Sequence, residues 1–147
     1  MTLGIKNLQA GSFTNANTNY FAAPQQINKN GVIIGHTHLV VQDVGSIDST
    51  NIPDPKVFAF FKGVNDAADN KGTVSVVLAG GLPAGSYRFC SITTSSNHVP
   101  CAVSIAQHGN LDDCVYVSRS LLLKYEKSIL NSNRTFFFGQ IVASSCS

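Results

Sequence analysis

Hydrophobic and polar residues alternate in short runs along most of the chain. The runs are rich in Val, Ile, Phe and Thr, and clusters of Gly, Pro, Asn and Asp separate them. Runs of this kind, bounded by turn residues, predict β-strands. We expect strands over residues 31–42, 57–63, 73–78, 84–94, 99–107 and 114–117.

The two ends of the chain follow other patterns. Residues 11–30 are rich in Asn, Gln, Ser and Thr, which fits either an irregular arm or a first edge strand. The apolar residues within 118–130 have the spacing of an amphipathic helix, so this segment is predicted to be helical. Residues 136–142 could form a final strand.

Several short strands at roughly regular spacing predict an all-β fold. We expect an antiparallel β-sandwich of immunoglobulin-like arrangement with about seven strands, followed by a short helical C-terminal segment. Residues 1–10 are interpreted as an N-terminal extension, 11–117 as the sandwich domain, and 118–147 as a C-terminal extension that can pack on the domain. The predicted core consists of Ile33, Val41, Phe58, Phe60, Val74, Val76, Leu78, Tyr87, Phe89, Ile105, Val115 and Val117.

The composition is that of one globular domain with a weakly charged surface. Of the 147 residues, 44% are hydrophobic and 12% are charged, which excludes a disordered chain. The net charge of +2 comes from scattered residues, so we expect no nucleic-acid partner, which would need a clustered basic surface. No apolar run is long enough to span a membrane. Such a surface is common in secreted proteins, although residues 1–6 lack the pattern of a signal peptide.

The cysteines fit a disulfide-bonded protein. Their number is even and their spacing excludes the Cys-x-x-Cys pattern of zinc knuckles and thioredoxin-like sites. Four cysteines allow three pairings, and buried free thiols are the alternative. The residues are Cys90, Cys101, Cys114 and Cys146.

The histidines are the strongest candidates for a binding site. His36 and His38 are two residues apart in a predicted strand, so both side chains leave the same face. His98 and His108 lie at opposite ends of another predicted strand. Imidazoles suit copper or zinc, with Asp112 or Asp113 as additional oxygen ligands. The alternative, which the sequence favours, is that all four histidines are structural residues of strands and turns.

No catalytic constellation stands out. The chain has no Gly-x-Ser-x-Gly motif for a nucleophilic serine. Asp112 and Asp113 are adjacent, so in an extended segment their carboxylates point apart and cannot flank a glycosidic bond. We therefore expect no enzyme. Asn133 begins the one clear N-glycosylation sequon.

Several motifs in order resemble a large family of small fungal secreted proteins, many of which carry a misleading ribosomal-protein label. They are Gly-His-Thr-His at 35–38, Phe-Ala-Phe-Phe-Lys-Gly-Val-Asn-Asp-Ala-Ala-Asp at 58–69, Gly-Leu-Pro-Ala-Gly-Ser-Tyr-Arg-Phe-Cys-Ser-Ile at 81–92, Asn-His-Val-Pro at 97–100 and Ala-Gln-His-Gly-Asn-Leu-Asp-Asp-Cys at 106–114. The resemblance covers residues 11–117. It implies secretion, a β-rich domain and a Cys90–Cys114 disulfide, and it implies no activity. Its histidine-bearing motifs match His36, His38, His98 and His108.

These observations lead to three hypotheses about function. The first is a non-catalytic secreted or cell-wall-associated protein that binds a partner or assembles with itself through exposed strand edges; cell-wall polysaccharide is the other candidate partner. The second is a secreted copper- or zinc-binding protein that uses the clustered histidines. The third is an enzyme that acts on wall polysaccharide.

Overall fold

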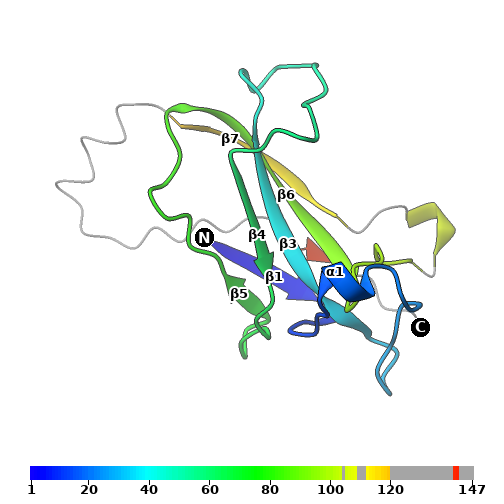
Figure 1. Cartoon of the computed structure of the whole chain (residues 1–147). Coiled ribbons are helices and arrows are strands. Elements are labelled where there is room, and N and C mark those ends of the chain that lie inside the picture. The colour runs from blue at the N-terminus through cyan, green and yellow to red at the C-terminus, as the bar shows by residue number, and fades with distance from the viewer. Residues whose placement is uncertain (104, 109–111, 120–140, 143–147) are drawn as a thin grey trace.

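The computed structural model describes residues 1–103, 105–108, 112–119 and 141–142 (Figure 1). These residues form strands and two very short helices. The strands are β1 (Thr2–Lys6), β2 (Leu8–Gln9), β3 (Ile33–Asp43), β4 (Phe60–Val64), β5 (Thr73–Ser75), β6 (Gly85–Ser95), β7 (Cys114–Arg119) and β8 (Ile141–Val142). The helices are α1 (Ala16–Asn19) and the 3-10 helix η1 (Ala106–His108).

The strands form two sheets. The larger sheet has the order β2-β3-β6-β7. Strand β2 pairs with the start of β3, at Ile33 and Ile34, and β4 pairs with β3 from Thr37 to Val41. The smaller sheet has the order β5-β1-β8. In Figure 1 the long strands β3 and β6 run side by side, and β1 passes across them. Strands β3 and β6 are antiparallel, in a register that runs from Gly35 opposite Ser95 to Asp43 opposite Tyr87. The predicted all-β sandwich is confirmed, with two short parallel pairings, β1 with β8 and β2 with β3.

The hydrophobic core lies between the two sheets. Leu39 and Val41 of β3 are at most 2% exposed and belong to the same cluster as Leu3 of β1 and Val74 of β5. Because side chains alternate along a strand, the residues between them point to the opposite face of the larger sheet. That outer face is where His36 and His38 lie.

Residues 1–10 contribute to the domain that we expected to begin at residue 11. Leu3 is buried in the main core, and Leu8 of β2 forms a second cluster with Ile33 and Cys101. Residues 11–30 form α1 and an isolated bridge from Ile27 to Ile33. Of the two alternatives predicted for this segment, it is therefore the irregular arm and not an edge strand.

Two sequence predictions about strands and core are wrong. The described residues of 99–107 form an isolated bridge at Pro100 and η1 in place of a strand. The Cys101 N–H still donates to the carbonyl of Thr93, but the Thr93 N–H donates to the Asp112 carboxylate and is not available to continue the ladder. Phe58 and Ile105, predicted to be core, are 52% and 56% exposed. Phe58 precedes β4, which begins at Phe60, so the strand does not carry it into the sheet.

The C-terminal predictions lie mainly outside the described residues. This applies to the helix within 118–130 beyond Arg119, to the sequon at Asn133, to Cys146, and to the strand at 136–142 apart from β8. Among the described residues, no helix has the length and hydropathy needed to cross a membrane.

Cys90 and Cys114 form the disulfide that the family resemblance implies. The two residues are directly opposite each other in the β6–β7 pairing. The bond therefore fastens the edge strand β7 to β6 at the point where β7 begins.

The close approach of β3 and β6 requires glycine at position 35. A Cβ atom added to Gly35 would lie 1.9 Å from the carbonyl oxygen of Thr94, so Gly35→Ala should force the strands apart. We expect the free energy of unfolding to fall by about 1–3 kcal/mol. Urea denaturation followed by circular dichroism measures this change.

Gly63→Ala in β4 is the matched control. Its added Cβ would meet only ordinary contacts at 3.5 Å, so stability should stay equal or rise slightly. Equal stability of the two variants would contradict the steric argument.

Candidate metal centre

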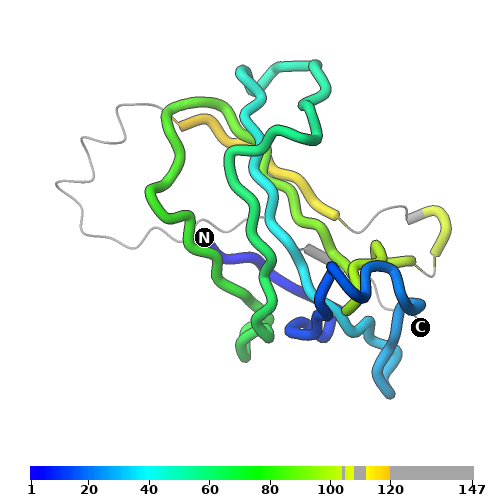
Figure 2. Tube along the Cα trace, viewed as in Figure 1, coloured from blue at the N-terminus to red at the C-terminus, as the bar shows by residue number. Residues whose placement is uncertain are grey.

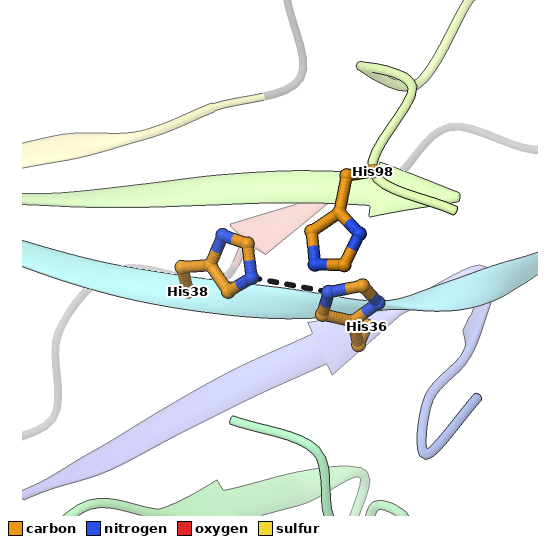
Figure 3. Close-up of side chains that lie close together, drawn as sticks. All are labelled: His36, His38 and His98. Carbon is orange, nitrogen blue, oxygen red and sulfur yellow. Dashed lines mark hydrogen bonds between the residues drawn. The ribbon is translucent and has the colours of Figure 1, made fainter. Parts of the chain in front are cut away.

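Three of the four histidines meet on the outer face of the larger sheet. His36 and His38 come from β3, and His98 comes from the turn that follows β6. Figure 3 shows one ring nitrogen of each histidine pointing toward the other two rings. The nitrogen atoms that each residue can offer to a metal ion all lie within 4.8 Å of one another.

His98 reaches this cluster through a tight turn at the end of β6. Its N–H donates to the carbonyl of Ser95 at 3.1 Å, and the N–H of Ser95 donates to the carbonyl of Val99 at 2.9 Å. His98 has a φ of 71°, a left-handed conformation that glycine usually supplies at this place in a hairpin loop. A histidine there costs about 1–2 kcal/mol of backbone strain.

Neighbouring hydrogen bonds hold this turn in place. The Asn97 side chain accepts from the Ser95 hydroxyl at 2.8 Å and donates to the carbonyl of Ala23 at 2.6 Å. The Phe21 N–H donates to the carbonyl of Asn97 at 3.0 Å. Residues 11–30, which we call the N-terminal segment, therefore stabilise the turn that carries His98.

The hydrogen bonds of His36 assign its tautomer. Its side chain is fully buried, and Nδ1–H donates to the carbonyl oxygen of Ser12 at 3.1 Å. Nε2 of His36 is therefore unprotonated and accepts a hydrogen bond from Nε2–H of His38 at 3.0 Å, with the Thr94 hydroxyl 3.4 Å away. A backbone carbonyl on the remote nitrogen is the usual arrangement for a histidine that binds a metal through its other nitrogen.

The separation of the two Nε2 atoms suits a shared ion. With metal–nitrogen bonds of about 2.0–2.1 Å, adjacent ligands are about 2.9 Å apart in tetragonal geometry and about 3.3 Å apart in tetrahedral geometry. The observed 3.0 Å between His36 and His38 is closer to the tetragonal value. His98 provides the third ligand nitrogen of the group.

Burial keeps the imidazoles uncharged. The pKa of His38 is lowered to about 4, chiefly by desolvation and in addition by the neighbouring His36 and His98. Desolvation and His98 also lower the pKa of His36, against the opposing effect of its bond to Ser12. At neutral pH both rings are therefore unprotonated bases, the form that a metal ion requires.

Of the other predicted ligands, Asp112 and Asp113 do not belong to this group. His108 is in η1, and its side chain falls outside the described part of the chain. The Asp112 carboxylate accepts from the Thr93 N–H at 2.6 Å, and Asp113 is exposed. Sequence reasoning missed the carbonyl of Ser12, because a backbone acceptor brought in by tertiary packing leaves no residue pattern.

Gly63 is a second residue that the sequence did not single out. It lies directly opposite His38 in the β3–β4 pairing, and a Cβ there would stand 3.5 Å from the His38 ring. A Cβ at this distance makes only an ordinary van der Waals contact with the imidazole, so the ring has space even beside alanine. A glycine opposite a histidine could have been noticed only once the strand register was known.

Comparisons with known proteins identify related sequences. A family model described as the CLU5d N-terminal domain matches residues 1–120. Pathogenicity cluster 5 protein d of the fungus Colletotrichum graminicola is 51% identical over 113 residues, which are 76% of this chain and 24% of that protein. The chain thus spans about a quarter of the length of this relative. Neither description names a catalytic activity. No solved structure matches.

The metal-free protein should lose stability in mild acid. The folded-state pKa of His38, about 4, lies below its ordinary value of 6.5, so the unfolded chain takes up a proton first as the pH falls. The stabilisation is complete above pH 6.5 and is lost progressively as the pH falls toward 4. Because solvent partly screens the ring, we expect a loss of about 1 kcal/mol between pH 7 and 5.

Urea denaturation of chelator-treated protein at the two pH values measures this loss. His38→Gln removes the titrating group and should reduce the pH dependence by that amount. An identical pH dependence in the variant and the parent protein would contradict the assignment.

Glycine at position 98 should be more stable than alanine at the same position. Both His98→Gly and His98→Ala remove the ring, whose buried Nδ1 has no hydrogen-bond partner among the described residues. Glycine alone also relieves the positive φ, so His98→Gly should exceed His98→Ala by about 1 kcal/mol in metal-free protein. Equal thermal midpoints in calorimetry would show that no backbone strain is stored at this turn.

Proposed function

The chain belongs to the family of CLU5d N-terminal domains, and we propose that this domain is a non-catalytic binding module that holds one copper ion through His36, His38 and His98. The observation that carries the proposal is the 3.0 Å approach of two neutral imidazole nitrogens, with a third histidine in the same group. Two ring nitrogens at this distance, one from the buried His36 and one from the partly buried His38, provide adjacent ligand positions for a single ion.

The cost of building the cluster supports a role for it. Histidine is held in a left-handed conformation at position 98, and a fully buried imidazole occupies position 36. Glycine at position 98 and an apolar residue at position 36 would serve the fold alone at lower cost. Strained and buried polar residues that gather at one place are typical of functional sites.

Copper fits this ligand set better than zinc. The Nε2 separation is near the tetragonal value, and Cu²⁺ stands above Zn²⁺ in the affinity order of nitrogen sites. The described residues of this group offer three ligands, fewer than the four of a structural zinc site and the same number as in a catalytic one. A bound ion would therefore keep an open position toward solvent or a further ligand.

We further propose that the protein acts outside the fungal cell. The Cys90–Cys114 disulfide supports this location, because such bonds form and persist in oxidising compartments. The weakly charged, polar surface fits the same environment. Assembly through exposed strand edges stays a prediction.

Copper titration of the full chain, produced without a polyhistidine tag, tests the proposed function. We expect one Cu²⁺ per chain at pH 7, with nitrogen hyperfine structure in the electron paramagnetic resonance spectrum. The double variant His36→Ala, His38→Ala should bind more than about a hundredfold more weakly. Zn²⁺ should compete less effectively than Cu²⁺.

Two further variants separate loss of ligands from loss of fold. His98→Gly removes one ligand at a position where glycine relieves strain, so weaker binding there reports on the ligand itself. Asp113→Asn removes an exposed carboxylate outside the histidine group and should leave binding unchanged. Copper binding that survives all the histidine variants would overturn the proposal.

A further inference from the structure

Exposed aromatic rings surround the histidine cluster. Each of the three histidines has an aromatic neighbour: Phe13 lies 6.1 Å from His36, Phe61 lies 5.4 Å from His38, and Tyr20 lies 6.0 Å from His98, measured between ring centroids.

Two more rings extend the group outward. Phe21 stacks on Tyr20 at 4.2 Å with an interplanar angle of 15°, and Phe58 lies 6.0 Å from Phe61. We call the five residues the aromatic face: Phe13, Tyr20, Phe21, Phe58 and Phe61.

The aromatic face is open to solvent. Its members are between 47% and 61% exposed, the lowest being Phe61 and the highest Tyr20. Three of them come from the N-terminal segment around α1, and the other two come from residues 58–61 at the start of β4. These two parts of the chain are far apart in sequence. Figure 2 shows the N-terminal segment, in blue, lying against the end of β6. Apolar surface gathered in one place in this way is typical of a binding surface.

The surroundings of this face carry almost no charge. Residues 7–28, 30–42 and 89–103, which build the cluster and much of its rim, contain no Asp, Glu, Lys or Arg. Asp54 and Lys56 are the charged residues just before Phe58. Lys62 follows Phe61, and strand alternation directs it to the other face of β4. Exposed amide and hydroxyl side chains of α1 and its cap flank Tyr20, namely Asn15, Asn17, Thr18 and Asn19.

We propose that the aromatic face docks an uncharged polysaccharide. A pyranose ring has an apolar C–H face that packs on an aromatic ring, and hydroxyl groups at its edge. Side-chain amides offer both a donor and an acceptor to such hydroxyls. The weakly charged rim matches a neutral ligand, whereas nucleic acid and anionic membranes would require clustered Lys and Arg.

This inference goes beyond copper binding and does not depend on it. The rings make their contacts through the C–H face of a sugar, so the docked chain needs no metal ion. Because Phe13, Phe61 and Tyr20 each contact one histidine, the same chain would lie beside the histidine cluster.

Binding of the full chain to insoluble polysaccharides tests the proposal. Depletion from solution by chitin, β-1,3-glucan and cellulose is measured in the presence of a chelator and again with copper. We expect retention on at least one of the three, equal in both conditions. Phe61→Ala and Tyr20→Ala should each raise the dissociation constant about tenfold.

Two matched variants control for apolar content and for folding. Phe61→Tyr keeps the ring and should keep binding, in contrast to Phe61→Ala. Val77→Ala removes a side chain that is 81% exposed after β5 of the other sheet, and it should have no effect.

Three results would overturn the inference. The first is no retention on any of the polysaccharides, and the second is equal retention of Phe61→Ala and the parent protein. The third is another occupant of the face: a dimer in light scattering that Phe61→Ala abolishes, or co-sedimentation with phosphatidylcholine vesicles that the same change abolishes.

Discussion

The pairing of β3 with β6 is the constraint on which the rest of the structure depends. It places Leu39 and Val41 against the smaller sheet and, by alternation, turns His36 and His38 to the outer face. The same pairing ends in the turn that carries His98. One ladder of hydrogen bonds therefore sets both the core and the candidate metal centre.

The N-terminal segment contributes the remaining contacts of the candidate metal centre. Its Ser12 carbonyl fixes the tautomer of His36, and its backbone hydrogen bonds hold the residues that precede His98. The segment also supplies three of the five aromatic rings around the site, Phe13, Tyr20 and Phe21.

The sequence predicted those parts that follow from local periodicity. Long alternating runs identified β3 and β6, and a spacing of two placed His36 and His38 on one face. The position of His98 could not be derived in the same way, because a turn and a left-handed φ brought it to the cluster. The run after it looked like a strand by composition, yet its pairing stops after Cys101, where the Asp112 carboxylate takes the Thr93 N–H. The exposure of Phe58 depended on where β4 begins, which composition did not specify.

The two faces of β3 have different tasks, and one register sets both. Leu39 and Val41 pack between the sheets on the inner face, whereas His36 and His38 meet His98 on the outer face. Because side chains alternate along a strand, a slip of the β3–β6 pairing by one residue would turn the histidines into the core and the aliphatic residues outward. A misregistered chain would therefore lose its packing and its cluster together, so the native register is the only one that provides either.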